Sequence, residues 1–534
     1  MLNSADIIAQ RLYAEGVRHA FGVPGGEVLT IIDALERAGI RFVLSRHENA
    51  AGFMAEGTWH ATGAPAVLIG TVGPGMANTV NVTANAQQDR VPLIVITGAV
   101  DEAEALTYTH QVFDHRAVLK PVVKASFEAR AGACDVMIDK AIRIATDPQP
   151  GPVHIDLPIS VAAADHLPAR PVQRAALSPV LPAGAAFDAA RDRFARADRP
   201  VLMVGLVILE SPGGVDTLRD VVERFSIPVV TTYKAKGVLP EGHALALGGH
   251  GLSPKSDAVV LPVLSEADLV ICAGYDPIEM RTGWRDPWDP TRAIAFTSVP
   301  DSQYMHHVSA AWTCDIGLGL AALAADQSPR PVWSDGTPDR ARTAHAEAFA
   351  APPGWGPSEA LHILNRLKPA EIVTTVDSGA HRILLSQVWT CEAARSLLQS
   401  TGLCTMGCAL PLAIGHRIGA PERPVMAVMG DGCLDMVLGE LATLRDVGLP
   451  VIVVVLNDAS LALIELKQRR DGKQNAGVDF GHTDYAAVAT AIGVNGTAVS
   501  DGAALEDAMR AALDATGPTL IDVRIPRRAY DGLI

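Results

Sequence analysis

Two apolar runs near the C-terminus, each followed by an acidic residue, define a βαβ unit and point to a parallel α/β architecture. "VMAVM" precedes Gly430-Asp431-Gly432, and "VIVVVL" precedes Asn457-Asp458. The segment between them is long enough for one helix. The pattern predicts a buried strand, a crossover helix over about residues 434–447 and a second, parallel strand. Both acids then lie at carboxyl ends of strands, the edge where open α/β sheets bind ligands.

Two carboxylates side by side repel each other unless a cation lies between them. A hard divalent ion such as Mg²⁺, which binds carboxylate, carbonyl and phosphate oxygens, fits this arrangement. The glycines permit a tight turn, and the helix that follows offers its N-terminus to an anion. The alternative is structural: Asp431 caps a strand-to-helix turn, and Asn457-Asp458 only opens another turn.

The same rhythm of short β-rich runs and helix-length segments occurs in three blocks. "APAVLIG", "RPVLMVG" and "EIVTTVD" are examples. Stretches rich in Pro, Ala and small polar residues, 165–184 and 326–357, separate the blocks and are predicted to be linkers. We therefore predict an α/β protein of three doubly wound parallel-sheet domains, at 1–165, 185–325 and 357–534. A composition with 49% apolar but only 5% aromatic residues agrees with buried parallel strands.

Charge and hydropathy argue against two classes of partner. The net charge of −15 comes with no basic stripe, so we expect no nucleic-acid partner. No run approaches 18 uninterrupted apolar residues, and "MLNSADIIAQRLYAEG" reads as an amphipathic helix rather than a leader. We expect no membrane partner and a cytoplasmic location. The seven cysteines are dispersed without a Cys-x-x-Cys pair, and are predicted to be reduced, mostly core thiols.

The acidic motifs carry a family resemblance. Gly-Asp-Gly, 24 residues and then Asn-Asp is similar to the Gly-Asp-Gly to Asn-Asn signature of thiamine diphosphate enzymes. Asp458 stands where the family commonly has a second asparagine, a variant also found in catabolic acetolactate synthases. The resemblance implies Mg²⁺ ligation by Asp431, Asp458 and the backbone carbonyl of Ser460. It also implies cofactor contacts from Gly430, Gly432, Cys433 and Leu461.

A second motif resembles the other half of such a site. "VLSRHENAAGFMAEG" is similar to the family segment whose glutamate hydrogen-bonds the aminopyrimidine ring of the cofactor, and it places Glu48 at that position. The alternative for Glu48 is an ordinary acid at a helix N-terminus. In this family the N-terminal domain of one subunit meets the C-terminal domain of the other. The resemblance therefore implies a homodimer or homotetramer with active sites at the subunit interface.

Four further segments resemble cofactor-lining parts of the family: "FGVPGGEV", "GTVGPGMAN", "DSGAHRILLSQ" and "STGLCTMGCALPLAIG". In the last, the carbonyl of Cys404 would receive the cofactor amino group, and Met406 would wedge between the cofactor rings. The alternatives are plain turns for the glycines and core packing for Met406. The cofactor contacts implied in these segments are Pro24, Gly25, Thr71, Gly73, Asn78, Gly379, Ala380, His381, Cys404 and Met406, and Gly26 is assigned to the substrate pocket.

The reaction is inferred from groups that the chain lacks. Decarboxylases of the family commonly carry two adjacent histidines and a later glutamate, which protonate the carbanion left by loss of CO₂. Here the corresponding positions hold His110-Gln111 and Ile464. An apolar, amide-lined pocket favours carboligation over protonation. The loop around Gln111 resembles that of acetolactate synthases, where the glutamine contacts substrate.

Within that group, "AGYDPIEMRTGW" and "AGVDFGHTDYAAVATAIG" resemble segments of the catabolic, flavin-free enzymes. FAD is possible but not favoured. Biosynthetic relatives carry a tryptophan where this chain has Lys467, which could instead bind an acidic donor or acceptor or be a solvated helix residue.

We predict a thiamine diphosphate- and Mg²⁺-dependent carboligase with Glu48, His110 and Gln111 as catalytic residues. A 2-oxo acid, most simply pyruvate, is decarboxylated and joined to a second 2-oxo acid or an aldehyde. The alternatives are a 2-oxo acid decarboxylase or 2-hydroxy ketone lyase of the same fold, and then a flavin oxidase. A nucleotide-binding dehydrogenase, for which the chain lacks the fingerprint, and a catalytically silent partner of an active homologue are weaker options.

Overall fold

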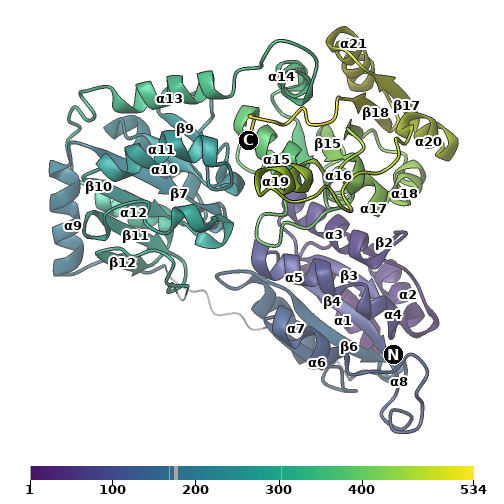
Figure 1. Ribbon diagram of the computed structural model, residues 1–534. Helices are drawn as coiled ribbons and strands as arrows, with labels where there is room; N and C mark the ends of the chain where they lie inside the picture. Colours follow the sequence, from purple (N-terminus) through teal and green to yellow (C-terminus); the bar gives the residue numbers. More distant parts are fainter. Residues whose placement is uncertain (1, 168, 173–178, 302) are drawn as a thin grey trace.

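Three six-stranded parallel sheets form the framework of the protein. The computed structural model describes residues 2–167, 169–172, 179–301 and 303–534. The strand orders are β2-β1-β3-β4-β6-β5, β12-β11-β10-β7-β8-β9 and β14-β13-β15-β16-β18-β17. In Figure 1 the central sheet and its helices lie on the left, and the C-terminal and N-terminal units lie above and below on the right. The prediction of three parallel α/β units is confirmed.

The first sheet falls within the predicted range 1–165. Its strands are β1 (His19–Gly22), β2 (Arg41–Leu44), β3 (Ala66–Gly70), β4 (Leu93–Ala99), β5 (Ala125–Glu128) and β6 (Val153–Pro158). Its main helices are α1 (Ser4–Ala14), α2 (Leu29–Ala38), α3 (Glu48–Thr62), α5 (Val80–Asp89) and α7 (Cys134–Thr146). The expected N-terminal amphipathic helix is α1, and β3 is buried at every position, as a central parallel strand should be.

The second sheet repeats the pattern in the middle of the chain. Its strands are β7 (Pro200–Val204), β8 (Val229–Thr231), β9 (Ala246–Gly249), β10 (Leu269–Ala273), β11 (Ala293–Thr297) and β12 (Ala310–Thr313). Its helices are α9 (Ala185–Arg196), α10 (Gly214–Phe225), α11 (Pro254–Glu266) and α12 (Ile316–Ala324).

The third sheet contains the βαβ unit with which the sequence argument began. Its strands are β13 (Val373–Val376), β14 (Leu397–Gln399), β15 (Val425–Gly430), β16 (Ile452–Asn457), β17 (Asn495–Val499) and β18 (Thr519–Arg524). Its helices are α14 (Pro357–Leu367), α15 (Ala380–Val388), α16 (Ala409–Gly419), α17 (Asp431–Val437), α18 (Glu440–Val447), α19 (Ala462–Arg470), α20 (Tyr485–Ile492) and α21 (Gly502–Leu513).

The predicted neighbouring strands are confirmed, because β15 and β16 pair in parallel with Gly430 opposite Leu456. The predicted single crossover helix is wrong in detail. It begins at Asp431 and divides into α17 and α18 at positions 438–439. Gly439 lies at this break, where the N-terminal unit approaches closely: the backbone N–H of Arg46 donates to Glu440. A glycine weakens the helix there.

The N-terminal and C-terminal units of the chain pack through α3 and α16. A Cβ at Gly415 on α16 would lie 1.9 Å from the carbonyl oxygen of Met54 on α3. Only glycine permits this approach of the two backbones. The packing fixes the relative position of the Glu48 helix and the C-terminal sheet within one chain.

The two predicted linkers fare differently. Segment 326–357 contains a helix, α13 (Thr337–Ala348), which packs against α11 and covers the central sheet. The linker prediction is therefore wrong for this helix, whose polar sequence obscured it. Segment 165–184 includes positions 168 and 173–178, which lie outside the described residues.

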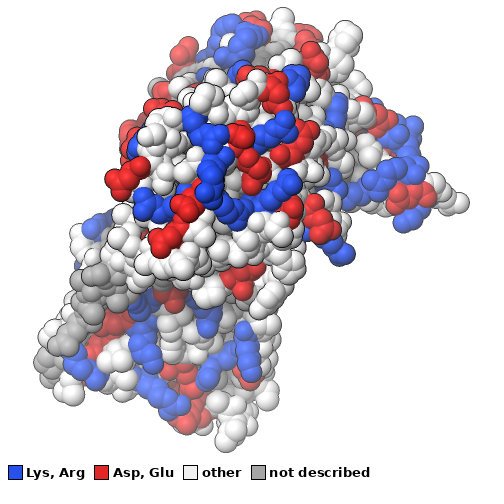
Figure 2. Space-filling view, turned by 90° about the vertical axis from the view of Figure 1, so that its left-hand side faces the viewer, with Lys and Arg blue, Asp and Glu red and all other residues white. Residues whose placement is uncertain are grey.

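The structure also describes the cysteines, the charges on one face and the lengths of the helices. All seven cysteines are free, five of them are buried, and Cys404 is exposed. On the face seen in Figure 2, basic and acidic side chains are interspersed and form no field of a single sign. Among the described helices, none combines the length and apolar character needed to cross a bilayer.

Candidate active site

A cavity of about 230 Å³ opens at the carboxyl edge of the C-terminal sheet. It lies beyond the ends of β13, β15 and β16, where ligands of open α/β sheets bind. Thirteen of the residues predicted from sequence line it: Gly379, Ala380, His381, Cys404, Met406, Gly430, Asp431, Gly432, Cys433, Asp458, Ser460, Leu461 and Ile464. Segments that are up to 85 positions apart in the chain, counted from 379 to 464, therefore meet at one edge.

Asp431 is the first of two buried carboxyl groups in this cavity. It is 2% exposed. One oxygen accepts the backbone N–H of Asp458 at 3.1 Å and that of Ala459 at 2.6 Å, and the other accepts the N–H of Gly432 at 2.8 Å. Burial raises the pKa of Asp431 to about 6, although these backbone hydrogen bonds lower it in part. The side chain is therefore fixed by three donors.

Asp458 is buried beside it and is less well satisfied. Its Oδ2 is buried and has no hydrogen-bond partner among the described residues. Burial and the charge of Asp431 raise the pKa of Asp458 to about 7. A buried, unpaired carboxylate oxygen next to a second carboxylate is costly without a counter-ion. The pair therefore fits a hard cation such as Mg²⁺. Ser460 lies two positions on; its hydroxyl donates to Asp479, and its backbone carbonyl is a candidate third ligand.

The opposite wall of the cavity offers a neutral imidazole and closely approaching backbone. His381, in the first turn of α15, is 5% exposed, and its Nε2 has no partner among the described residues. Burial, together with the charge of Arg382, lowers the pKa of His381 to about 3, so the imidazole is neutral. A Cβ at Gly430 would lie 3.1 Å from this ring, and one at Gly432 would lie 2.8 Å from Leu461 Cδ2. A diphosphate fits a wall of this kind.

The loop before α16 supplies the third side of the cavity. Cys404 adopts a left-handed conformation with φ of 55°. Arg382 donates to the carbonyl of Ser400 at 2.5 Å and to Cys404 Sγ at 3.2 Å. Met406 reaches across the cavity, with its Cε 3.7 Å from the position of a Cβ at Gly432. An unusual backbone conformation held by a buried arginine is consistent with a loop that presents a carbonyl to a ligand.

The N-terminal residues predicted from sequence gather in a second group around Glu48. Glu48, at the start of α3, is 6% exposed and accepts a hydrogen bond from Asn78 Nδ2 at 2.9 Å. A Cβ at Gly75 would lie 3.4 Å from Glu48 Oε1. Thr71 donates to Glu27 and closely approaches Gly25.

A loop that includes Gln111 covers this group. A Cβ at Gly73 would lie 2.5 Å from the carbonyl oxygen of Gln111, which has a φ of 61°. His110 is exposed, and a Cβ at Gly26 would meet nothing within 4 Å. None of the N-terminal residues is among the described residues that line the C-terminal cavity. One chain therefore presents two half-sites.

The structure adds three polar lining residues to those assigned a role from the sequence, and of these only Tyr530 lies outside the quoted motifs. Tyr530, near the C-terminus and 4% exposed, lines the cavity, as do Ser378 and Arg382. Tyr530 sits in "RRAYDGLI", which has no recognisable pattern; only an aromatic residue in a polar tail could have drawn attention to it. Lys467 lies one turn after Ile464 on α19, is exposed, and does not line the cavity of the single chain.

Family models match all three parts of the chain. The thiamine pyrophosphate enzyme N-terminal TPP binding domain matches residues 2–118, the central domain residues 187–323, and the C-terminal TPP binding domain residues 377–523. The chain belongs to the thiamine pyrophosphate enzyme family. The predicted thiamine diphosphate (thiamine pyrophosphate) enzyme is thus confirmed.

Within this family the chain is similar to acetolactate synthases. It is 33% identical to an acetolactate synthase large subunit of Parasynechococcus marenigrum, over 98% of this chain and 88% of the relative. It is 29% identical to an acetolactate synthase of Bacillus subtilis, over 98% and 93%, and 29% identical to a catabolic acetolactate synthase of Raoultella terrigena, over 98% and 95%. The acetolactate synthase-like assignment is confirmed. Both a large subunit and a catabolic enzyme match nearly the full chain, so the catabolic branch stays a prediction.

Proposed function

We propose that the protein decarboxylates a 2-oxo acid and joins the remaining fragment to a second carbonyl compound, with thiamine diphosphate and Mg²⁺ bound. The observation that best supports a metal ion is the buried Oδ2 of Asp458, which has no partner among the described residues and lies beside Asp431. Asp431, Asp458 and the Ser460 carbonyl would hold the ion. When bound, the cofactor supplies a nucleophilic ring carbon that attacks the 2-oxo group and stabilises the negative charge left by loss of CO₂.

The chain's own groups divide the remaining work. The buried Nε2 of His381 would face the diphosphate, and Met406 would support the bent cofactor. Glu48 would hold the aminopyrimidine ring and stabilise the form of it that takes up a proton. The carbonyl of Cys404 would accept a hydrogen bond from the amino group on the same ring. Each of these roles needs a fixed side chain or backbone atom. Glu48 and His381 are buried, Met406 is half-buried, and Cys404 is exposed.

Carboligation is favoured by what surrounds the reacting fragment. Among the described lining residues of the cavity, the only carboxyl groups are Asp431 and Asp458, which the ion would occupy. Ile464 stands at the mouth of the cavity, and Gln111 offers an amide that does not titrate. With no acid on the C-terminal wall free to protonate the fragment, attack on a second carbonyl competes well.

The relatives and Lys467 suggest the substrates and the type of acetolactate synthase. Pyruvate is the simplest donor, because the relatives are acetolactate synthases. The ammonium group of Lys467 has no side-chain partner among the described residues, and Lys467 follows the pocket residue Ile464 by one helical turn. Its ammonium group could attract an acidic second substrate. We propose a flavin-free enzyme of the catabolic type, which a colourless purified protein would support and a tightly bound yellow chromophore would contradict.

The two half-sites imply an assembly. The C-terminal cavity lacks a glutamate for the aminopyrimidine, and the Glu48 group lacks the ion site. We propose that two copies of the chain, as a dimer or within a tetramer, place the Glu48 half-site of one copy against the cavity of the other. A cytoplasmic location stays a prediction that cell fractionation would test.

The decisive experiment follows carbon from a panel of 2-oxo acids. The purified protein is incubated with thiamine diphosphate, Mg²⁺ and each acid, and CO₂ and carbon–carbon coupled products are measured together. We expect CO₂ with a coupled product, pyruvate being the best donor, and no CO₂ from Glu48→Gln or after chelation of the metal. Release of an aldehyde as the sole product would refute carboligation and leave the cofactor assignment intact.

A further inference from the structure

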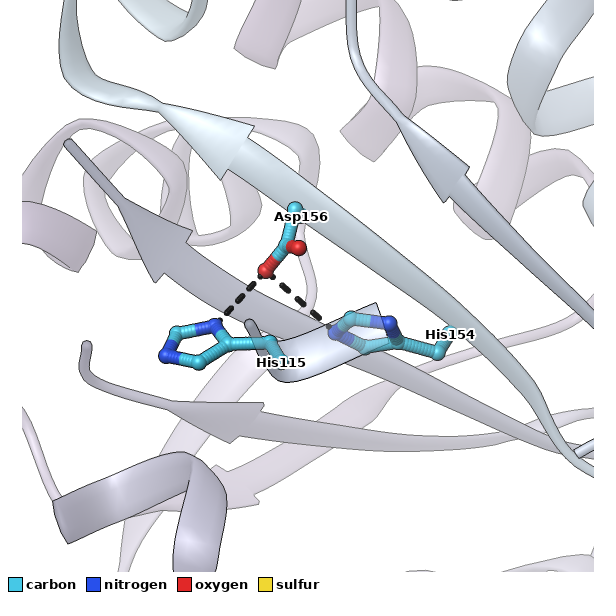
Figure 3. A group of neighbouring side chains, drawn as sticks. All are labelled: His115, His154 and Asp156. Carbon is cyan, nitrogen blue, oxygen red and sulfur yellow. Dashed lines mark hydrogen bonds and ion pairs between the residues drawn. The ribbon is translucent and has the colours of Figure 1, made fainter. Parts of the chain in front are cut away.

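A buried cluster of side chains lies behind the Glu48 half-site and has no part in the function proposed above. His115 opens a short helix, α6 (His115–Leu119), and His154 and Asp156 lie on β6, as Figure 3 shows. His115 Nδ1 lies 2.8 Å from Asp156 Oδ1, and His154 Nε2 lies 3.5 Å from the same oxygen. All three are buried. Two histidines and a carboxylate could in principle bind a metal.

The hydrogen bonds of the cluster exclude that reading. His154 Nδ1 lies 2.8 Å from Ser126 Oγ, and His154 Nε2 lies 2.8 Å from Thr97 Oγ1. His115 Nε2 accepts the backbone N–H of Gly73 at 3.1 Å. All four ring nitrogens are thus engaged with protein groups, whereas a histidine ligand needs a free lone pair directed at the ion. The cluster is a hydrogen-bond network that ends on the backbone of Gly73.

The position of the proton on His115 follows from its partners. A backbone N–H can only donate, so His115 Nε2 carries no proton, and the ring proton resides on Nδ1. Nδ1–H then donates to Asp156. Burial alone would raise the pKa of Asp156, but hydrogen bonds from His115 and His154 lower it below its ordinary value, so the carboxylate stays ionised. Asp156 thereby selects the tautomer of His115 that can accept from Gly73.

Gly73 belongs to a loop that touches two predicted catalytic residues. Its φ is +68°, and a Cβ there would lie 2.5 Å from the carbonyl oxygen of Gln111. Two positions on, Gly75 lies against the carboxylate of Glu48, and Asn78 hydrogen-bonds that carboxylate. His115 is four residues after Gln111 in the chain. One imidazole therefore ties together the loop that contacts Glu48 and the loop that carries Gln111.

We propose that His115, oriented by Asp156, is a positioning residue of the active site: its Nε2 anchors the Gly73 backbone and so fixes Gln111 relative to Glu48. The catalytic consequence rests on the carboligation proposed above, whereas the anchoring itself does not. If the anchor is lost, the loop moves, water gains access to the reacting fragment, and a larger share of turnovers ends in protonation rather than ligation.

Two matched variants separate the two hydrogen bonds of His115. In His115→Gln the side-chain amide lies near the former Nε2, so it can still accept from Gly73. In His115→Asn the amide lies near the former Nδ1, so it can still donate to Asp156 but does not reach Gly73. Phe113 packs edge-on against the ring, with centroids 5.0 Å apart, and loses that contact in both variants. A defect that appears in His115→Asn but not in His115→Gln therefore reports on the Gly73 anchor, because only His115→Asn keeps the bond to Asp156.

The first readout is hydrogen–deuterium exchange of the peptide spanning residues 70–78, which requires no substrate. We expect faster exchange in His115→Asn than in wild type, with His115→Gln close to wild type. The second readout is kcat/KM for ligation together with the fraction of CO₂ released without a coupled product. We expect a roughly tenfold fall in kcat/KM for His115→Asn, or about 1.4 kcal/mol, with a raised uncoupled fraction and recovery in His115→Gln.

Equal exchange in wild type and His115→Asn would overturn the proposal, as would equal loss of activity in both variants with unchanged product ratios. The failure of the carboligase assignment would look different. In that case the wild type itself would give no coupled product from any 2-oxo acid, while the exchange contrast between the two variants would still be seen.

Discussion

Replacing Asp458 by asparagine should stabilise the protein without metal and abolish its response to metal. The pKa of Asp458 is raised from 3.8 to about 7 by burial and the charge of Asp431. A raised folded-state pKa gives stability that is present below about pH 4 and is lost as the pH rises through about 7. At roughly 1.4 kcal/mol per unit, the loss is at most about 4 kcal/mol. An amide avoids it.

The matched control is Asp431→Asn. Both oxygens of Asp431 accept backbone N–H groups, so an amide in either orientation turns an NH₂ toward a donor. We expect that conflict to cost about 1–3 kcal/mol. It offsets the gain of at most about 3 kcal/mol from removing a carboxyl group whose pKa is raised to about 6. The two substitutions remove the same charge, yet Asp458→Asn should be the more stable variant.

Thermal unfolding at about pH 8, in chelator and then with Mg²⁺ and thiamine diphosphate, measures both effects. For a domain of this size each kcal/mol moves the midpoint by roughly 2–4 °C. In chelator, Asp458→Asn should unfold several degrees above wild type, and Asp431→Asn should unfold below Asp458→Asn. With Mg²⁺ and thiamine diphosphate, only the wild type should gain stability, by about 2.7 kcal/mol of unfolding free energy at a hundredfold excess of ligand over Kd. The reasoning is refuted if Asp458→Asn is as unstable as Asp431→Asn, or if it keeps the metal-dependent gain.

Three further outcomes test separate parts of the structure. Burial raises the pKa of Glu56 to about 8 despite the opposing charge of Lys234. The wild type should therefore lose stability as the pH rises from about 4.5 to 8. In Glu56→Gln this loss of unfolding free energy, a few kcal/mol at most, should be absent. In Gly75→Ala the new Cβ would lie 2.8 Å from Thr71 Cγ2 and 3.4 Å from Glu48 Oε1. We expect a several-fold weaker affinity for thiamine diphosphate, measured by calorimetry. Wild-type affinity would show that the loop can shift to accommodate the methyl group. Ile464→Glu places an acid at the cavity mouth, so the ratio of aldehyde to coupled product should rise severalfold; an unchanged ratio would mean that Ile464 is too far from the reacting carbon to matter.

The fold and the pairing of Asp431 with Asp458 could be predicted because their signals are local. A buried parallel strand is a continuous apolar run, and the acid that follows it is adjacent in sequence to the strand's end. Neighbouring strands then bring Asp431 and Asp458 together without further information. The same reasoning failed where the polarity of a segment does not indicate its structure. The sequence of helix α13 is polar and alanine-rich, so it resembles a linker. Only its packing on α11 shows that it is part of the central unit.

The residues that sequence reasoning missed act through long-range contacts. His115 and Asp156 are 41 positions apart, and neither stands in a pattern with a meaning of its own. Their link to Gly73 depends on where a loop returns to a sheet edge, which no local propensity encodes. Tyr530 reaches the cavity because the C-terminal tail folds back over the sheet. For residues of this kind, only the packed structure reveals the partner.

The most direct test of the shared active site is complementation between two inactive variants. Glu48→Gln damages one half-site and Asp431→Asn the other, so each homodimer should be inactive. Co-expression of differently tagged chains gives mixed dimers that hold one intact site and one doubly damaged site. With random pairing, the mixture should recover about a quarter of wild-type activity, concentrated in the doubly tagged fraction. If that fraction is as inactive as its parents, Glu48 and the ion site do not meet across two subunits.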